Sequence, residues 1–222
     1  MHLPVIENEI LDNLAETPTG FTVDAMTRLG YVGWLDGITT FGGKANLAGR
    51  ARTLSFARRN DGKTTHSSIY TVMRGFGPGD VVVAAVNAGR HWILGENVAH
   101  EALYCGVNGV LTDACVRDAI ELKQMDFAIF AAGVSVIPPF ADLVLEAIDV
   151  PVTLAGTRVH AGDLIHADSD GALVVSHSVI NKVVFQINDI AKIEDEQEQA
   201  IRSRASLDII GDILRRKKTL KP

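Results

Sequence analysis

The sequence predicts an α/β fold with a mixed, partly parallel sheet and a long C-terminal helix. Short apolar runs, such as residues 81–86 and 109–112, alternate with short segments of helical periodicity, which is typical of a partly parallel sheet. A hydrophobic fraction of 47% over 222 residues is enough for a well-buried core. Since no linker is long enough to separate two domains, we expect residues 1–222 to form a single domain.

The N-terminal part is predicted to hold a helical layer, a loop and a strand. The helical layer covers residues 5–30, as two short helices broken at 17–20, and a glycine-rich loop follows at 31–43. Residues 48–56 alternate like a strand. Arg50 and Arg52 share one face of it, where a solvated surface or an ion pair between subunits is favoured over an acidic ligand.

The middle of the chain alternates strands with short helices. Residues 58–65 are typical of a surface loop, and the glycine turn at 75–80 lacks the lysine of a phosphate loop. The predicted strands are 81–86, a run ending at Leu94, 110–112, 127–130 and 150–154, and the predicted helices are 67–74, 98–105 and 119–125. An irregular segment is expected around Pro138 and Pro139.

The C-terminal part is predicted to be a hairpin and a helical extension. Two strands within residues 164–175 are joined at Asp168-Ser169-Asp170-Gly171, where turn chemistry is favoured over calcium binding. The helical extension covers residues 178–222. Its basic run at 215–218 is expected to be a solvated last turn.

Composition excludes several classes of function. A formal charge of −6 argues against a nucleic-acid groove, and no apolar run reaches the ~18 residues of a membrane span. The N-terminus lacks the pattern of a signal peptide, so a cytoplasmic protein is predicted. Cys105 and Cys115 lie in apolar segments without CxxC spacing, which favours packing over redox chemistry.

The candidate site lies between residues 93 and 121. An apolar strand runs into Gly95 and Glu96 ahead of an amphipathic helix, whose first N–H groups suit an anion. A second strand, 109–112, precedes Arg117 and Asp118, and adjacent parallel strand ends would bring Glu96 and Asp118 to one volume. The alternative for Arg117 and Asp118 is a helix cap with a surface ion pair.

Three motifs resemble the RraA-like family: residues 109–118, residues 150–163 and residues 167–171. The resemblance implies a swivelling β/β/α fold. The family includes 4-hydroxy-4-methyl-2-oxoglutarate aldolases, class II pyruvate aldolases that also decarboxylate oxaloacetate, and the regulator of ribonuclease E. Its aldolases carry an acidic residue, twenty intervening positions and Arg-Asp, whereas the regulator has glycine at the first place. Glu96, residues 97–116 and Arg117-Asp118 match the aldolase form.

The resemblance also implies roles for these residues. The backbone N–H groups of Gly95, Glu96, Asn97 and Val98 would hold the substrate carboxylate, and Arg117 would bind the oxygens of a small 2-oxo acid. Asp118 would hold a divalent metal, Mg²⁺ or alternatively Mn²⁺, with Glu96 in its outer shell. A glutamate from a neighbouring subunit of a homotrimer or hexamer would complete the site, and Glu198 is the best positional match.

The predicted chemistry suits these residue types. Carbon–carbon cleavage beside a pyruvoyl group leaves a negatively charged enolate. Mg²⁺ usually takes one or two carboxylates and keeps its waters, and arginine is always cationic. We therefore predict a metal-dependent aldolase with oxaloacetate decarboxylase activity. The alternative is a non-catalytic regulator that binds a ribonuclease or a helicase, because Glu121, three residues after Asp118, is similar to the regulator's pattern.

Overall fold

The computed structural model describes residues 3–59, 68–87 and 89–221. Residues 60–65 of the predicted surface loop lie outside the described residues. The chain forms two compact units: the larger comprises residues 1–16 and 33–177, and the smaller comprises residues 17–32 and 178–222. The prediction that the whole chain folds as a single domain stays a prediction.

The larger unit is organised around a mixed sheet. In the described residues its strands follow the order β1-β14-β13-β3-β4-β6-β8-β2, with β10 paired to β3. The central strands β3, β4, β6 and β8 are parallel, and the others are antiparallel to their neighbours. The strands are β1 Trp34–Leu35, β2 Thr39–Thr40, β3 Leu47–Arg58, β4 Asp80–Ala85, β6 Gly109–Thr112, β8 Ala128–Ala131, β10 Leu143–Ile148, β13 Leu164–Asp168 and β14 Gly171–Val175.

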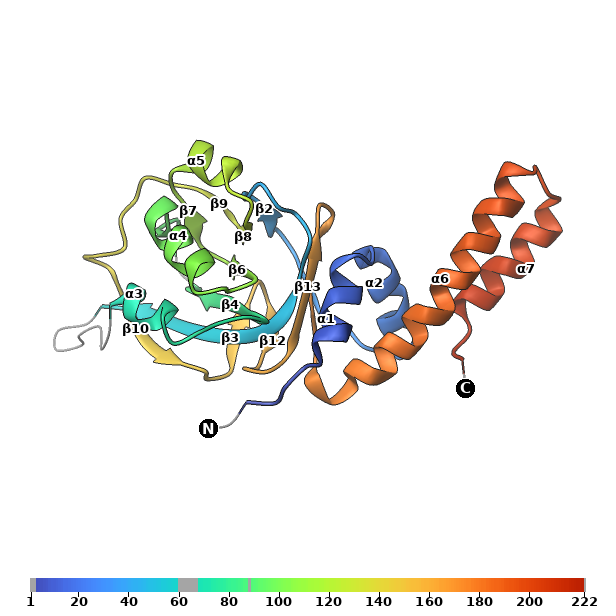
Figure 1. The fold of residues 1–222 in the computed structure, drawn as a ribbon, viewed down its shortest axis with the longest axis horizontal. Helices are drawn as coiled ribbons and strands as arrows, with labels where there is room; N and C mark the ends of the chain where they lie inside the picture. The colour runs from blue at the N-terminus through green and yellow to red at the C-terminus, as the bar shows by residue number, and fades with distance from the viewer. Residues whose placement is uncertain (1–2, 60–67, 88, 222) are drawn as a thin grey trace. The chain divides into compact units, whose positions relative to one another are not determined.

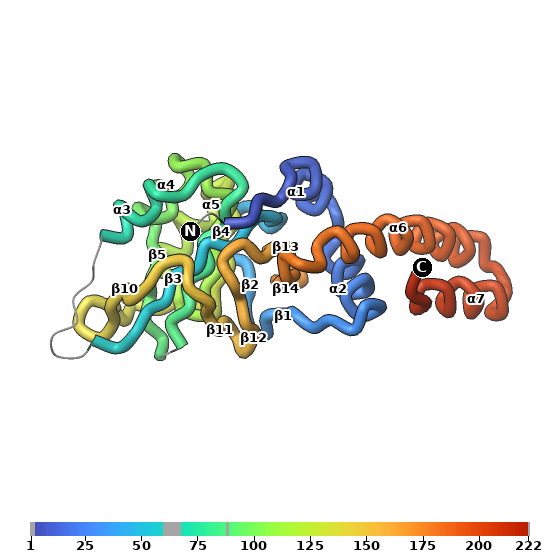
Figure 2. The backbone as a smooth tube through the Cα atoms, turned by 90° about the horizontal axis from the view of Figure 1, so that it is seen from below, coloured from blue at the N-terminus to red at the C-terminus, as the bar shows by residue number. Residues whose placement is uncertain are grey.

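Both faces of this sheet are covered, as buried parallel strands require. Helices cover one face, and a two-stranded hairpin covers the other (Figures 1 and 2). The covering elements are α3 Ile69–Met73, α4 Glu96–Tyr104, α5 Ala119–Gln124, β11 Val152–Leu154 and β12 Thr157–Val159. Each face has its own apolar core: Val82, Val110 and Ile129 point to the helices, and Val81, Val83 and Leu111 point to the hairpin. The alternating residues of each strand thus fill two cores.

The predicted α/β class and most predicted elements are confirmed. Helix α1 (Asn8–Ala15) belongs to the larger unit, and the hairpin turn is fixed by Asp168 Oδ1, which accepts the Asp170 N–H at 2.9 Å. Cys115 is buried, and Cys105 packs against the helical core. Strand β10, however, was not predicted, because its apolar half is short and its place comes from antiparallel pairing with β3, far away in sequence.

The expectation of a solvated face for Arg50 and Arg52 was wrong. Both arginines form ion pairs with Asp80 of their own chain, and Arg52 also pairs with Asp149. The register of β3 and β4 sets Arg50 beside Asp80, which the sequence does not reveal. The network therefore belongs to the sheet, and its arginine side chains are mostly buried rather than solvated.

The smaller unit consists of helices. After the short helix η1 (His177–Val179), the predicted C-terminal extension forms helices α6 (Ile180–Arg202) and α7 (Leu207–Lys218), and α2 (Thr19–Arg28) packs against α6. Arg28 pairs with Asp189 at 2.9 Å and donates to the carbonyl oxygen of Lys217. The basic last turn is only partly solvated, because Lys217 pairs with Asp24 and Glu194. Among the described residues, no helix has the length and apolarity that crossing a membrane requires.

Candidate active site

The site begins where two short strands end side by side. β5 (Trp92–Leu94) runs parallel to β7 (Cys115–Val116), which in turn pairs with β9 (Gly133–Val134). The Arg117 N–H donates to the carbonyl oxygen of Leu94 at 2.9 Å, so the residues that follow both strands start from adjacent positions. The predicted meeting of two strand ends is therefore correct, but the second strand is β7. Residues 109–112 belong to the large sheet instead.

Asp118 connects the two segments. Its backbone is left-handed, with φ of 59° and ψ of 42°, a conformation that aspartate and asparagine tolerate better than most residues. Its Oδ2 accepts a hydrogen bond from the N–H of Glu96 at 3.0 Å and lies 3.5 Å from Nε of Arg117. The Asp118 carboxylate thus contacts the backbone of Glu96, whereas the Glu96 carboxylate lies beside His100. That the two carboxylates share one volume stays a prediction.

Gly95 is required by close packing rather than by its backbone angles. Its φ of −137° is ordinary for any residue, but an added Cβ would lie 2.5 Å from Asp118 Oδ2 and 2.9 Å from Arg117 Nε. Any larger residue would therefore displace the aspartate or the arginine. This glycine lets the start of α4 approach both side chains.

The first turn of α4 has N–H groups without partners inside the helix, and their binding of a substrate carboxylate stays a prediction. Glu96 is the first residue of the helix, and its N–H is already used by Asp118. The N–H groups of Asn97 and Val98 have no acceptor within the helix, because the first turn lacks preceding carbonyl groups. Of the predicted anion cradle, these two groups are available to a ligand and lie at the positive end of the helix dipole.

The charged side chains of the site are all partly exposed. The exposed fractions are 47% for Arg117, 36% for Asp118 and 43% for Glu96. Nε2 of His100 lies 3.6 Å from Glu96 Oε1, one helical turn further along. The Arg117 guanidinium lies 4.0 Å from the centroid of the Trp92 ring, a cation–π contact that holds its plane.

The loop between β6 and β7 is fixed by its own side chains. Thr112 Oγ1 donates to the Ala84 carbonyl oxygen at 2.8 Å and accepts the Ala114 N–H at 3.0 Å. Asp113 accepts the N–H groups of Val86 and Asn87. Burial raises the pKa of the Asp113 carboxyl above its ordinary value, and these two hydrogen bonds offset part of that rise. The loop that leads to Arg117 and Asp118 is thus tied to the end of β4.

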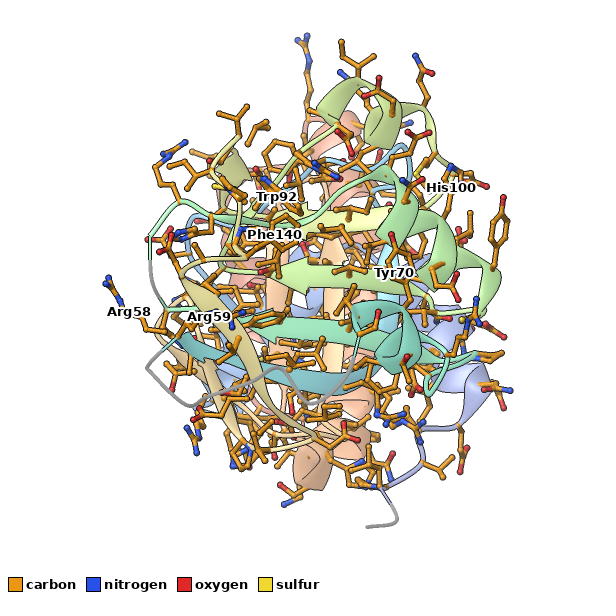
Figure 3. All side chains as sticks on the ribbon, turned by 90° about the vertical axis from the view of Figure 1, so that its left-hand side faces the viewer. Arg58, Arg59, Tyr70, Trp92, His100 and Phe140 are labelled. Atoms are coloured by element: carbon orange, nitrogen blue, oxygen red, sulfur yellow. The ribbon has the colours of Figure 1, made fainter. Side chains whose placement is uncertain are left out.

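A cavity of about 390 Å³ opens beside Arg117. Its walls are mainly apolar and include Phe56, Ile69, Trp92, Val98, Phe140 and Leu145. Figure 3 shows Trp92 and Phe140 together, whereas His100 lies apart from them on α4. Trp92 and Phe140 were not predicted as site residues, because 47 residues lie between them in the sequence and only the folded loops bring them together.

The two carboxylates fit a sparse metal site of the magnesium type. Within the described part of the chain, no three His, Cys, Asp or Glu side chains come together as a metal cluster. Mg²⁺ needs only one or two carboxylates, and Asp118 and Glu96 offer partly exposed oxygens. Glu198 lies on α6 of the smaller unit, where it pairs with Arg202. Its contribution to a neighbouring subunit's site stays a prediction.

The family model described as "RraA-like: Aldolase/RraA" matches residues 19–174. The chain belongs to the RraA-like family. A protein of Alkalilimnicola ehrlichii, named a candidate 4-hydroxy-4-methyl-2-oxoglutarate aldolase, is 32% identical over 143 residues, which cover 63% of this chain and 83% of the relative.

Solved structures of similar proteins share this RraA-like fold. A protein from Pseudomonas syringae pv. tomato aligns with a TM-score of 0.80 and 26% identity, over 92% of this chain and 98% of that chain. Streptomyces coelicolor RraAS2, described as an unusual member of the RNase ES inhibitor RraA protein family, aligns with a TM-score of 0.78 and 25% identity, over 89% and 98%. The predicted fold class, with its long C-terminal helix, is confirmed.

Proposed function

We propose that the chain is a divalent-metal-dependent class II aldolase that cleaves a 4-hydroxy-2-oxo acid of the 4-hydroxy-4-methyl-2-oxoglutarate type. The observation that carries the proposal is the contact between Asp118 Oδ2 and the Glu96 N–H, with Arg117 alongside. This contact brings a partly exposed carboxylate and a guanidinium to the N-terminus of α4, whose first residue carries the second carboxylate, Glu96. The names of relatives at about 32% identity support the same reaction.

The helix and the arginine would bind the substrate's pyruvoyl end. A carboxylate at the start of α4 would accept hydrogen bonds from the N–H groups of Asn97 and Val98. Arg117, whose plane is held by Trp92, would donate to the keto oxygen. Since arginine keeps its charge at any relevant pH, it would stabilise negative charge there without changing protonation.

The carboxylates Asp118 and Glu96 would hold Mg²⁺, or alternatively Mn²⁺, with Glu96 in the outer shell. The cation, when bound, would add Lewis-acid stabilisation for negative charge on the substrate oxygens. Arg117 and Asp118 are in contact, so the guanidinium also compensates the aspartate charge. The Glu198 carboxylate of a neighbouring subunit, in a homotrimer or hexamer, would complete this acidic group.

The cleavage needs one proton acceptor. Glu96, whose Oε1 lies 3.6 Å from His100 Nε2, is our candidate for taking the proton of the C4 hydroxyl, directly or through a water molecule. The C3–C4 bond then breaks, its electron pair stays on C3 as the pyruvate enolate, and C4 becomes a carbonyl carbon. Protonation of C3 completes pyruvate. Loss of carbon dioxide from oxaloacetate leaves the same enolate, so the site would also decarboxylate that substrate.

Pyruvate release tests the proposal. Lactate dehydrogenase would report pyruvate from 4-hydroxy-4-methyl-2-oxoglutarate, and cleavage should give two pyruvate molecules per substrate. We expect EDTA to stop release and excess Mg²⁺ to restore it. Full turnover in EDTA, or no pyruvate release with Mg²⁺ or with Mn²⁺, would contradict the proposal. In the second case, the ribonuclease-inhibitor name of one structural relative makes a regulator the next candidate.

A further inference from the structure

The cavity beside Arg117 and the proposed active site share part of their walls. Val98, in the first turn of α4, and Arg117 both line the cavity. They are also residues to which substrate binding is assigned. If the helix N-terminus and the guanidinium hold the pyruvoyl end of a 2-oxo acid, the rest of the substrate lies next to the cavity.

The cavity is larger than a methyl substituent needs. Its volume of about 390 Å³ falls in the range of pockets that bind small molecules, about 300–1,000 Å³. A methyl group on C4 would leave most of this space unfilled. Filling the space with apolar atoms would remove apolar surface from water on both the ligand and the wall.

The wall has an aromatic corner. The rings of Trp92 and Phe140 meet edge to face, at 5.3 Å between centroids and an interplanar angle of 85°. Trp92 is 8% exposed, whereas Phe140 is 69% exposed and contacts the cavity from the loop that precedes β10. A corner of this kind suits a second ring or a branched apolar group, which would cover Phe140.

We propose that this cavity binds an apolar substituent on C4 of the 2-oxo acid, of about the size of a phenyl group. The proposal rests on the proposed function, because the pyruvoyl end must lie at Arg117. It makes the substrate class a 2-oxo acid with a bulky apolar tail rather than only a methyl-bearing one.

Arg59 offers an alternative, in which the cavity binds an anionic tail instead of an apolar one. It lines the cavity from the position that follows β3. Its neighbour Arg58 is exposed but is not part of the lining, and Figure 3 shows it directed outward. If the cavity took an anionic tail, Arg59 would bind it and Arg58 would not, so the two arginines form a matched pair.

Binding of uncleavable ligands tests the proposal without turnover. Neither 2-oxobutanoate nor 2-oxo-4-phenylbutanoate has a C4 hydroxyl, so neither can undergo the cleavage. Titration calorimetry with Mg²⁺ present should show about tenfold tighter binding of the phenyl compound. Phe140→Ala should lower this preference to about twofold. Val136→Ala, a change at a 90% exposed residue of the same loop outside the lining, should leave it unchanged.

Three outcomes would overturn the proposal. The first is equal affinity for the two ligands, and the second is a preference that Phe140→Ala does not alter. The third is tighter binding of the dicarboxylate 2-oxoglutarate than of the phenyl compound, lost in Arg59→Met but kept in Arg58→Met, which would assign an anionic tail to the cavity. The pyruvate assay is separate: phenyl preference without turnover contradicts the aldolase proposal alone, and turnover without preference contradicts the tail proposal alone.

Discussion

Two groups of arginines and aspartates in the larger unit use the same residue types in different ways. In the sheet, Asp80 accepts from Arg50 and Arg52, while Arg52 also donates to Asp149 at 2.9 Å and 2.7 Å. The Asp80 side chain is only 3% exposed, and the guanidinium of Arg52 also lies over the Phe76 ring. Each charge there is neutralised by its own chain.

The candidate site leaves its charges available. Asp118 and Glu96 keep partly exposed oxygens, and Arg117 lies between a carboxylate and a cavity. Such an arrangement contributes little to stability, because exposed ion pairs are worth at most about 1 kcal/mol. The closed group (Arg50, Arg52, Asp80 and Asp149) therefore stabilises the fold, whereas the open group (Glu96, Arg117 and Asp118) keeps charges that a ligand can reach.

The largest effect is expected from Asp118→Asn. Asparagine tolerates the left-handed backbone and can still accept the Glu96 N–H, so only the charge is removed. We expect kcat/KM for pyruvate release to fall at least about 100-fold, with unchanged stability. Glu121→Gln removes an exposed carboxylate from the first turn of the same short helix, α5, and should change neither property. Equal losses of kcat/KM in both variants would show that activity depends on the net negative charge of this region and not on the Asp118 carboxylate itself.

Asp80→Asn should lower stability and leave activity unchanged, the opposite of Asp118→Asn. Removing the buried carboxylate leaves Arg50 and Arg52 without their shared partner, and the free energy of unfolding should fall by about 3 kcal/mol, measured by urea denaturation. This value lies at the lower end for buried pairs because both arginines are partly exposed. The folded variant should keep its kcat/KM. A free energy of unfolding equal to that of the unaltered protein would show that the ion pairs of Asp80 contribute no more to stability than exposed surface pairs do.

Arg117→Lys separates the effect of charge from that of the planar guanidinium in the open group. Lysine keeps the positive charge but loses the planar guanidinium and its contact with Trp92, so kcat/KM should fall about 30-fold. Arg158→Lys, at an exposed position on β12, is the control and should have no effect. If lysine served as well as arginine at 117, only charge would be needed there.

Gly95→Ala gives the smallest effect on the site. Asp118 Oδ2 would have to move away from the new Cβ, which weakens its hydrogen bond to Glu96 and lowers stability by about 1 kcal/mol, with about tenfold lower kcat/KM. Gly20→Ala in α2 meets no atom within 4 Å and should instead stabilise the protein by about 0.5–1 kcal/mol. Thermal denaturation and the pyruvate assay would measure both.

Local signals predicted the parts of this molecule that depend on nearby residues. The alternation of apolar runs predicted the sheet, and the acidic residue followed by Arg117-Asp118 predicted which residues meet. Contacts set by distant pairing were not predictable. The register of β3 and β4 places Arg50 beside Asp80. The contact between Trp92 and Phe140 depends on a loop that is distant from Trp92 in sequence.

The most direct test of the central claim measures both properties on Asp118→Asn and Asp80→Asn, side by side with the unaltered protein. For each protein, kcat/KM for pyruvate release with Mg²⁺ and the free energy of unfolding would be determined on one preparation. We predict that Asp118→Asn loses activity but keeps its stability, and that Asp80→Asn loses stability but keeps activity per folded molecule. An active Asp118→Asn variant, or parallel losses in both variants, would contradict the assignment of the open group as the active site.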